Sequence, residues 1–252
     1  MIQPDLRMYV AVVSTGRSSN VSSMQKLIGP ATWYVGRGEH EDYLMQGASL
    51  VKEVGSLCAS RNAALYDAWN MNLPCVQVSD DLCRIQGVVY DPDQKKMKVV
   101  RLSFEKACST IYEEMLAIDA RLGGVAPTDN PLNFSSRRPV KTSHFIVGDF
   151  LVTLPCGVLF DEAFTLKEDY DYTLQHLMRY GVVARCDSIL AEFKHRTNIG
   201  GAVDVRTSQL EEENIALLKS KWRRYIVDNP KRPHEVLLRW ERSDVSHSMR
   251  HR

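Results

Sequence analysis

The chain has 252 residues, of which 44% are hydrophobic and 25% charged, so its composition is that of an ordinary globular protein. The length is sufficient for one large α/β domain or two small ones with a real hydrophobic core. The formal net charge of +1 excludes a global electrostatic attraction for nucleic acid, so any such contact must depend on a local basic patch.

The first third of the chain alternates predicted strands and helices. Residues 8–14 and 32–36 are short, apolar and rich in β-branched or aromatic side chains, which is typical of buried strands. A helix is expected from about residue 43 to 53, and a second helix begins with Ser60 as its cap. Residues 75–78 form the third predicted strand. This alternation predicts an α/β fold with a Rossmann-like, mostly parallel central sheet flanked by helices.

The middle of the chain continues the pattern less regularly. Residues 88–101 are expected to form a hairpin with a polar turn, followed by a helix over residues 104–121. Residues 123–131 contain two adjacent glycines and two prolines, and are expected to break regular structure. A strand is predicted over residues 152–160, with an interruption at Pro155.

The last third contains two predicted helices and one strand. A helix begins at Thr165, with Glu168 completing a capping box, and a strand covers residues 182–186. Ser208 and Glu211 form a second capping box before the last helix. The tail after Trp240 is polar, and we expect it to fray.

Two acids follow directly on the third predicted strand, in the turn Ser79-Asp80-Asp81. In parallel α/β sheets, ligands bind beyond the carboxyl ends of the strands, and the polar loop of residues 15–20 is expected at the same edge. No glycine-rich dinucleotide fingerprint or P-loop accompanies them. Adjacent carboxylates suit Mg²⁺ or Mn²⁺ bridging a diphosphate, whereas a turn with two solvated acids is the simpler interpretation of the dipeptide alone.

A second acidic cluster, Glu168-Asp169-Tyr170-Asp171, lies at the start of a predicted helix. The helix dipole and the capping box explain Glu168 without any catalysis. They explain Asp169 less well, and a carboxylate held in the first turn of a helix beside a cleft is a workable general base. A structural and a catalytic role both remain open for this cluster.

His195 lies in a polar, cationic segment that is followed by Gly200-Gly201. A lone histidine is more often structural than a ligand. The loop-like surroundings nevertheless suit phosphate contact, and neutral imidazole is a common metal ligand.

The cysteines and the apolar runs indicate the compartment. None of the six cysteines forms a CxxC pair, so we expect reduced, mostly buried thiols. No apolar run approaches the roughly 18 residues that span a bilayer, and the N-terminus lacks a secretory leader. We therefore expect no membrane association and a cytoplasmic location.

Taken in order along the chain, these segments resemble the TET-associated glycosyltransferases, a family with phage members. The resemblance extends from about Tyr9 to Trp240. The segments that carry it are residues 14–17, 60–65, 78–81, 123–127, 167–171, and the stretch from Lys219 through Trp222 to Arg232-Pro233 and Trp240.

The resemblance implies a GT-A glycosyltransferase fold with a metal site. Ser79-Asp80-Asp81 takes the place of the DxD motif, with Asp81 on the metal and Asp80 facing the ribose or sharing the metal. His195 matches the C-terminal metal-binding histidine. Asp169 matches the aspartate of the xED motif, which is the base in inverting members. Ser79 takes the place of the first acid of a strict DxD motif.

The same resemblance assigns the substrates and the halves of the domain. A UDP-sugar donor is implied, contacted by Thr15, Gly16, Arg17, Arg61 and Ser79 together with Asp80. A single GT-A-like domain is implied, with residues 1–86 as the nucleotide-sugar-binding half and residues 87–207 as the acceptor and catalytic half. Residues 208–240 form a C-terminal helix and strand, and residues 241–252 a tail. His144, Gly148, Asp149 and Glu168 are candidates for the sugar or acceptor pocket.

The expected acceptor is DNA that carries 5-hydroxymethylcytosine, because phage members of the family occur with oxygenases that make such bases. If phage-encoded, the chain acts in the cytoplasm of the infected host. A basic patch near the C-terminus, with aromatic residues interleaved, could follow phosphates and stack bases, or could equally be an ordinary amphipathic helix. The patch consists of Lys219, Lys221, Trp222, Arg223, Arg224, Tyr225, Lys231, Arg232, Arg239 and Trp240. Residues 135–141 are a second basic candidate.

Three alternatives remain open from the sequence. The chain could glycosylate protein Ser or Thr, it could be a catalytically silent GT-A-like module that binds nucleic acid or a partner, or it could transfer a nucleotide with the same metal site. Product analysis distinguishes the enzymes, and Asp169→Asn distinguishes an enzyme from a binding module.

Overall fold

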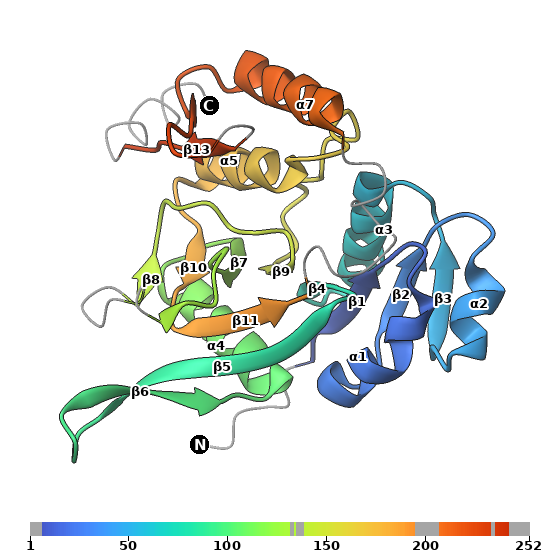
Figure 1. Cartoon of the computed structure of the whole chain (residues 1–252), viewed down its shortest axis with the longest axis horizontal. Coiled ribbons are helices and arrows are strands. Elements are labelled where there is room, and N and C mark those ends of the chain that lie inside the picture. Colours follow the sequence, from blue (N-terminus) through green and yellow to red (C-terminus); the bar gives the residue numbers. More distant parts are fainter. Residues whose placement is uncertain (1–6, 132–133, 135–138, 195–206, 233–234, 242–252) are drawn as a thin grey trace.

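The computed structural model describes residues 7–131, 134, 139–194, 207–232 and 235–241 (Figure 1). The strands of its central sheet are β1 (Tyr9–Val13), β2 (Thr32–Val35), β3 (Leu50–Glu53), β4 (Cys75–Ser79), β7 (Leu122–Val125), β8 (Val140–Lys141), β9 (Phe150–Thr153) and β10 (Ala184–Cys186). They lie in the order β3-β2-β1-β4-β9-β7-β10-β8. All run in one direction except β9 and β8, which are antiparallel to their neighbours. The predicted α/β class with a mostly parallel central sheet is confirmed, and this sheet is compatible with a Rossmann-like fold.

Helices cover both faces of this sheet. The helices are α1 (Val21–Ile28), α2 (His40–Met45), α3 (Leu57–Asn70), α4 (Phe104–Ala117), α5 (Glu168–Tyr180) and α7 (Ser208–Lys221), and a 3₁₀ turn, η1 (Ser18–Asn20), precedes α1. Alternate residues of β1 point to opposite faces. Val12 packs in a core with buried residues of α1 and α4, whereas Tyr9 and Ala11 pack in a second core with α3 and α5.

Two smaller sheets complete the fold. The strands β5 (Leu82–Asp91), β6 (Lys96–Arg101) and β11 (Ile189–Phe193) form an antiparallel sheet in which β5 is central. The predicted hairpin over residues 88–101 is therefore confirmed. Near the C-terminus, β12 (Ile226–Asp228) pairs with β13 (Val236–Leu238). No helix of the described residues is long and apolar enough to cross a membrane.

The helix predicted over residues 43–53 is wrong, because a strand occupies its second half. The helix α2 ends at Met45, and Gly47 adopts a positive φ of 89° that an L side chain rarely adopts. The chain then turns into β3, which pairs in parallel with β2. Helix α1 was not predicted, although Val21, Met24 and Ile28 follow helical spacing and are all buried.

The break predicted over residues 123–131 is also wrong at its start, because Gly123 and Gly124 lie inside β7. A Cβ on Gly123 would lie 2.5 Å from the Met115 sulfur of α4, and one on Gly124 would lie 2.5 Å from Ile146. The glycines therefore allow close packing on both faces of the strand. Strand β9 ends at Thr153, before Pro155, so the strand predicted over residues 152–160 is largely wrong.

The caps of three helices differ from the predicted ones. Ser56 rather than Ser60 caps α3, and Thr207 rather than Ser208 caps α7. Lys167 precedes α5 with a positive φ of 62° and no side-chain cap, so the predicted capping box at Thr165 is wrong. The Thr165 hydroxyl instead accepts a hydrogen bond from Asn214 of α7, which joins the two helices.

The six cysteines are all free, in agreement with the predicted reduced thiols. Four of them are buried and two are partly exposed, and burial raises the pKa of the thiols. None of them is therefore prepared as a nucleophile.

Candidate functional site

The chain order of the sheet reverses between β1 and β4, since β2 and β3 lie on one side of β1 and β4 on the other. Such a reversal places a crevice at the carboxyl ends of the two strands. Ser14 follows β1 there, and Asp80 and Asp81 follow β4. The Ser14 hydroxyl donates to Asp80, which joins the two strand ends directly.

Arg17 and Tyr43 complete this corner of the site. Arg17 Nη1 lies 3.0 Å from Asp80 Oδ1 and 4.0 Å from Asp81 Oδ2. The Tyr43 hydroxyl lies 2.5 Å from Ser14 Oγ and accepts from the Arg17 amide at 3.2 Å. Tyr43 was not predicted as a site residue, because it reaches the site from α2 only after β2 and β1 have paired.

Asp80 and Asp81 are buried, with 4% and 7% of their surfaces exposed. Burial raises the pKa of Asp80, while Ser14 and Arg17 oppose the rise and the charge of Asp81 adds to it. Arg17 lies beside both enclosed carboxylates, and carboxylate oxygens are donors that a hard cation prefers. Among the described residues no group of three His, Cys, Asp or Glu side chains is arranged to hold a metal, and the predicted ligand His195 lies outside them.

The backbone beside His195 is nevertheless fixed at this site. Lys194, which follows β11, donates its amide hydrogen to the Asp81 carbonyl at 3.0 Å. β11 pairs with β5, which begins directly after Asp81, and Phe193 lies opposite Leu82 in the register. The last described residue before His195 therefore lies next to Asp81, and His195 itself is outside the described residues.

Ser79 connects the acid pair to the loop before β9. Its amide donates to the Asp149 carbonyl at 2.8 Å, and its hydroxyl donates to Asp149 Oδ1 at 2.9 Å. The Ser79 hydroxyl therefore positions the Asp149 carboxylate at the same edge as Asp80 and Asp81.

Asp169 is held at the same edge from the first turn of α5. Its Oδ2 accepts from the Gly148 amide at 3.1 Å, and its Oδ1 accepts from the Tyr170 amide at 2.9 Å. Burial, together with the nearby charge of Glu168, raises the pKa of Asp169 to about 7. Some of its surface remains accessible to solvent. A half-enclosed carboxylate of this kind can exchange a proton near neutral pH.

Arg61 of α3 connects the loop that contains Gly148 to strand β4 and to the start of α5. Its guanidinium donates to Gly148 O at 3.1 Å and to Gln77 at 3.2 Å, and lies 3.3 Å from Glu168 Oε1. The residue is buried, and Gln77 returns a hydrogen bond to its carbonyl at 2.9 Å. Arg61 was predicted to contact donor phosphates, but these contacts give it a positioning role under the site.

Thr15 and Gly16, predicted to contact the donor, are exposed and face Glu39. Thr15 Oγ1 donates to Glu39 Oε1 at 2.7 Å, and the Gly16 amide donates to Oε2 at 3.0 Å. Glu39 was missed by the sequence reasoning. Because a carboxylate accepts from both groups, this part of the loop is better suited to hydroxyl groups than to phosphates.

Within the described structure, no hydrogen bond joins His144 to these residues. Partial burial, with the charges of Arg185 and Lys141, lowers its pKa. Its prediction as a pocket residue is therefore left without structural support.

The C-terminal basic patch is largely neutralised. Lys219 pairs with Asp228, and Lys221 lies 2.7 Å from Asp161 and 2.8 Å from Asp171. The aromatic residues Trp222, Tyr225 and Trp240 pack against the second core. The amphipathic-helix alternative thus describes much of this segment. Residues 135–138 of the second basic candidate lie outside the described residues.

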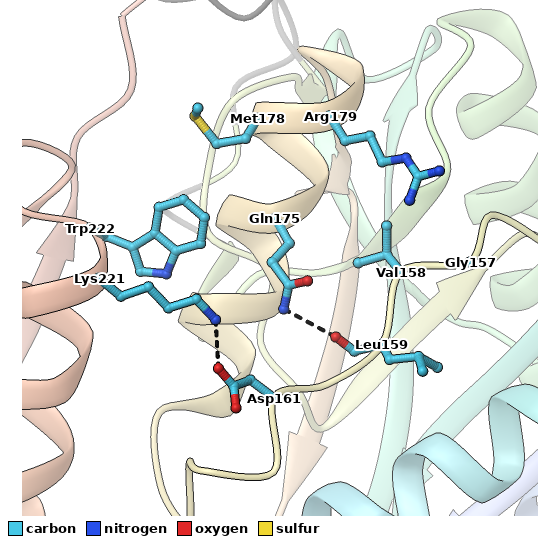
Figure 2. A pocket seen from close by; sticks show the side chains of 9 residues that line it. All are labelled: Gly157, Val158, Leu159, Asp161, Gln175, Met178, Arg179, Lys221 and Trp222. Atoms are coloured by element: carbon cyan, nitrogen blue, oxygen red, sulfur yellow. Dashed lines mark hydrogen bonds and ion pairs between the residues drawn. The ribbon is translucent and has the colours of Figure 1, made fainter. Parts of the chain in front are cut away.

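A surface hollow lies between α5 and the end of α7, and Figure 2 shows its lining. The Lys221–Asp161 ion pair crosses it, and Gln175 donates to the Leu159 carbonyl at 3.0 Å. None of the residues at the sheet edge described above lines it. The hollow is therefore separate from the candidate site.

No protein-family model matches the chain, and no curated protein matches it.

The packing around Gly148 leaves little room for a side chain. A Cβ at this position would lie 2.8 Å from Arg61 Nη2 and 3.3 Å from the Asp169 Cβ. We expect Gly148→Ala to displace the guanidinium and to lower the free energy of unfolding by about 1–3 kcal/mol. Urea unfolding measures the loss. The control is Ala63→Ser on α3. A second glycine such as Gly29 would not serve, because its positive φ makes any substitution by alanine strained. An unchanged midpoint for Gly148→Ala would contradict the described packing.

Proposed function

We propose that the chain is a metal-dependent, inverting glycosyltransferase of the GT-A type that moves a sugar from a UDP-sugar to the hydroxyl of 5-hydroxymethylcytosine in DNA. The observation that carries the proposal is a convergence of acids at one edge of the sheet. Asp80 and Asp81 lie at the switch point, and Ser79, Asp149 and Gly148 connect them to Asp169 through hydrogen bonds. The resemblance of the sequence to TET-associated glycosyltransferases supplies the reaction and the substrates.

Asp169 is the proposed general base. In the ionised form it takes the proton from the acceptor hydroxyl while that oxygen bonds to the anomeric carbon. The bond from this carbon to the diphosphate breaks in the same displacement, and the UDP leaves with its electron pair. Attack from the face opposite the leaving group inverts the anomeric centre. A pKa of about 7 suits a base that works near neutral pH.

Asp80, Asp81 and His195 are the proposed ligands of Mn²⁺ or Mg²⁺. When bound, the ion would neutralise charge on the leaving diphosphate. The burial of two adjacent carboxylates, Asp80 and Asp81, supports this assignment, and so does the hydrogen bond from the Lys194 amide to the Asp81 carbonyl. Arg17 is placed to add positive charge beside the same phosphates.

The decisive experiment incubates DNA containing 5-hydroxymethylcytosine with a panel of UDP-sugars and Mn²⁺, and analyses the nucleosides by mass spectrometry. We expect a hexose adduct on the hydroxymethylated base and none on DNA with unmodified cytosine. Transfer to protein hydroxyls alone would overturn the DNA acceptor, and transfer of a nucleotide instead of a sugar would overturn the reaction. If UDP-sugar is neither bound nor consumed, the glycosyltransferase proposal fails altogether.

The pH dependence provides a separate check on the base. Because the ionised form of Asp169 is the active one, kcat/KM is expected to fall about tenfold for each pH unit below 7 and to reach a plateau above about pH 8. Initial rates between pH 5.5 and 8.5 at saturating Mn²⁺ measure this. A profile that is flat across this range would exclude Asp169 as the base.

A further inference from the structure

The hairpin of β5 and β6 projects from the body of the protein, as Figure 1 shows. The pairing of β5 with β11 ends at Gly87, whereas its pairing with β6 continues to Asp91. The outer part is therefore a two-stranded ribbon without a third strand. We call residues 88–99 the β-arm.

Cations are concentrated along one strand of the β-arm and its base. Lys95, Lys96, Lys98 and Arg101 are exposed. In the part of the chain that the structure describes, none of the four takes part in an ion pair, in contrast to Lys219 and Lys221 of the C-terminal patch. Strand β6 contains no acid. Two solvated cations, Lys96 and Lys98, share one face because they are two residues apart in a strand.

Two acids lie in the same hairpin and limit its charge. Asp91 accepts hydrogen bonds from the amides of Asp93 and Gln94, so it is engaged in forming the turn. It also lies opposite Lys96 in the register. The excess of positive charge is therefore modest, and it suits a weak, salt-sensitive contact with a polyanion rather than a tight site.

The β-arm is connected directly to the candidate site. β5 begins at Leu82, immediately after Asp81, and Lys98 lies opposite Val89. At about 3.3 Å per residue, Lys96 and Lys98 lie roughly 23–30 Å from Leu82 along the ribbon. This span is comparable to the roughly 34 Å of one helical turn of B-DNA, whose major groove admits a two-stranded β-ribbon.

We propose that the β-arm holds double-stranded DNA on the flank of the modified base, with Lys96 and Lys98 on its phosphates. The inference rests on the proposed DNA acceptor and deepens it by naming the element that holds the duplex. Contacts of this type carry no sequence information, so the β-arm would position the DNA while residues at the sheet edge act on one base.

The test measures the binding of a fluorescent 30-base-pair duplex with unmodified cytosine by anisotropy, without UDP-sugar. In 50 mM salt we expect Lys96→Gln/Lys98→Gln to weaken binding about tenfold, and to reduce the slope of log K against log salt by about 2. Arg223→Gln/Lys231→Gln removes the same charge from the C-terminal patch and should bind within about twofold of the unaltered chain. Circular dichroism and thermal unfolding verify that both variants are folded.

Three other outcomes would overturn the inference. If only Arg223→Gln/Lys231→Gln lowered the affinity for the duplex, the C-terminal patch and not the β-arm would be the DNA contact. Binding to single strands or anionic vesicles but not to the duplex would identify a different partner. Sugar transfer to DNA without any effect of Lys96→Gln/Lys98→Gln on affinity would leave the proposed function standing and remove the β-arm from it. Duplex binding through the β-arm without sugar transfer would support the DNA contact of the β-arm and remove the proposed sugar transfer.

Discussion

Asp169→Asn is expected to lower kcat by a factor of about 10²–10⁴, because an amide keeps the size of the side chain but cannot accept the proton of the acceptor hydroxyl. The hydrogen bond from Gly148 is retained, since the amide oxygen of asparagine still accepts it, whereas the bond from the Tyr170 amide is lost because asparagine has a single acceptor oxygen. We therefore expect KM for the UDP-sugar to change by less than about threefold. Steady-state rates with hydroxymethylated DNA measure both quantities.

The control for this variant is Asp228→Asn, the same chemical change at an exposed carboxylate that pairs with Lys219 outside the site. It should leave the rate unaltered. A catalytically silent binding module would show no difference between the two variants in assays of substrate binding or sugar transfer. If Asp169→Asn retained most of the transferase activity, another group would have to be the base.

The same substitution should stabilise the protein in a defined pH window. Burial raises the pKa of Asp169 in the folded state, so the folded protein binds the proton more tightly than the unfolded chain. Stability is therefore lost as the pH rises from about 4 to about 7, and Asp169→Asn removes that loss. At pH 8 the expected gain in the free energy of unfolding is on the order of 1–3 kcal/mol. Urea unfolding at pH 5 and pH 8 tests this, and a gain that does not grow with pH would contradict the raised pKa.

Arg61→Ala is expected to have the largest effect on stability. The substitution leaves the Glu168 carboxylate and the Gly148 carbonyl enclosed without the guanidinium that satisfies them. Removing one partner of a buried ion pair typically costs about 3–5 kcal/mol, because the remaining charge stays desolvated. The midpoint of urea unfolding should fall accordingly, with little change in the slope.

The matched control is Arg84→Ala, since Arg84 also pairs with a glutamate, Glu192, but both side chains are exposed. Its expected cost is below about 1 kcal/mol. Combining Arg61→Met with Glu168→Gln removes both charges, and should cost less than the sum of the single changes. If Arg61→Ala cost no more than Arg84→Ala, the described network under Asp169 would be wrong.

The accuracy of the sequence predictions followed the range of the interactions involved. Strands β1, β2 and β4 were predicted because their apolar residues are consecutive, which is a local signal. Strand β3 was missed because Leu50–Glu53 becomes a strand only through pairing with β2. Gly123 and Gly124 were taken as a break, whereas their lack of side chains is what admits Met115 and Ile146. Propensity cannot reveal such a close approach, because it depends on a distant helix and loop.

The sequence alone therefore determined the α/β class, the strand-end position of Asp80 and Asp81, and Asp169 as a carboxylate at a helix start. It could not determine the partners of these groups. Only the tertiary structure decided that Ser14 and Arg17 contact Asp80 and that Arg61 pairs with Glu168. It also decided that Lys219 and Lys221 are in ion pairs, whereas Lys96 and Lys98 of β6 form none with the described residues. The physical reason is that burial and charge pairing arise between segments far apart in the chain, so they exist only once the sheet has formed.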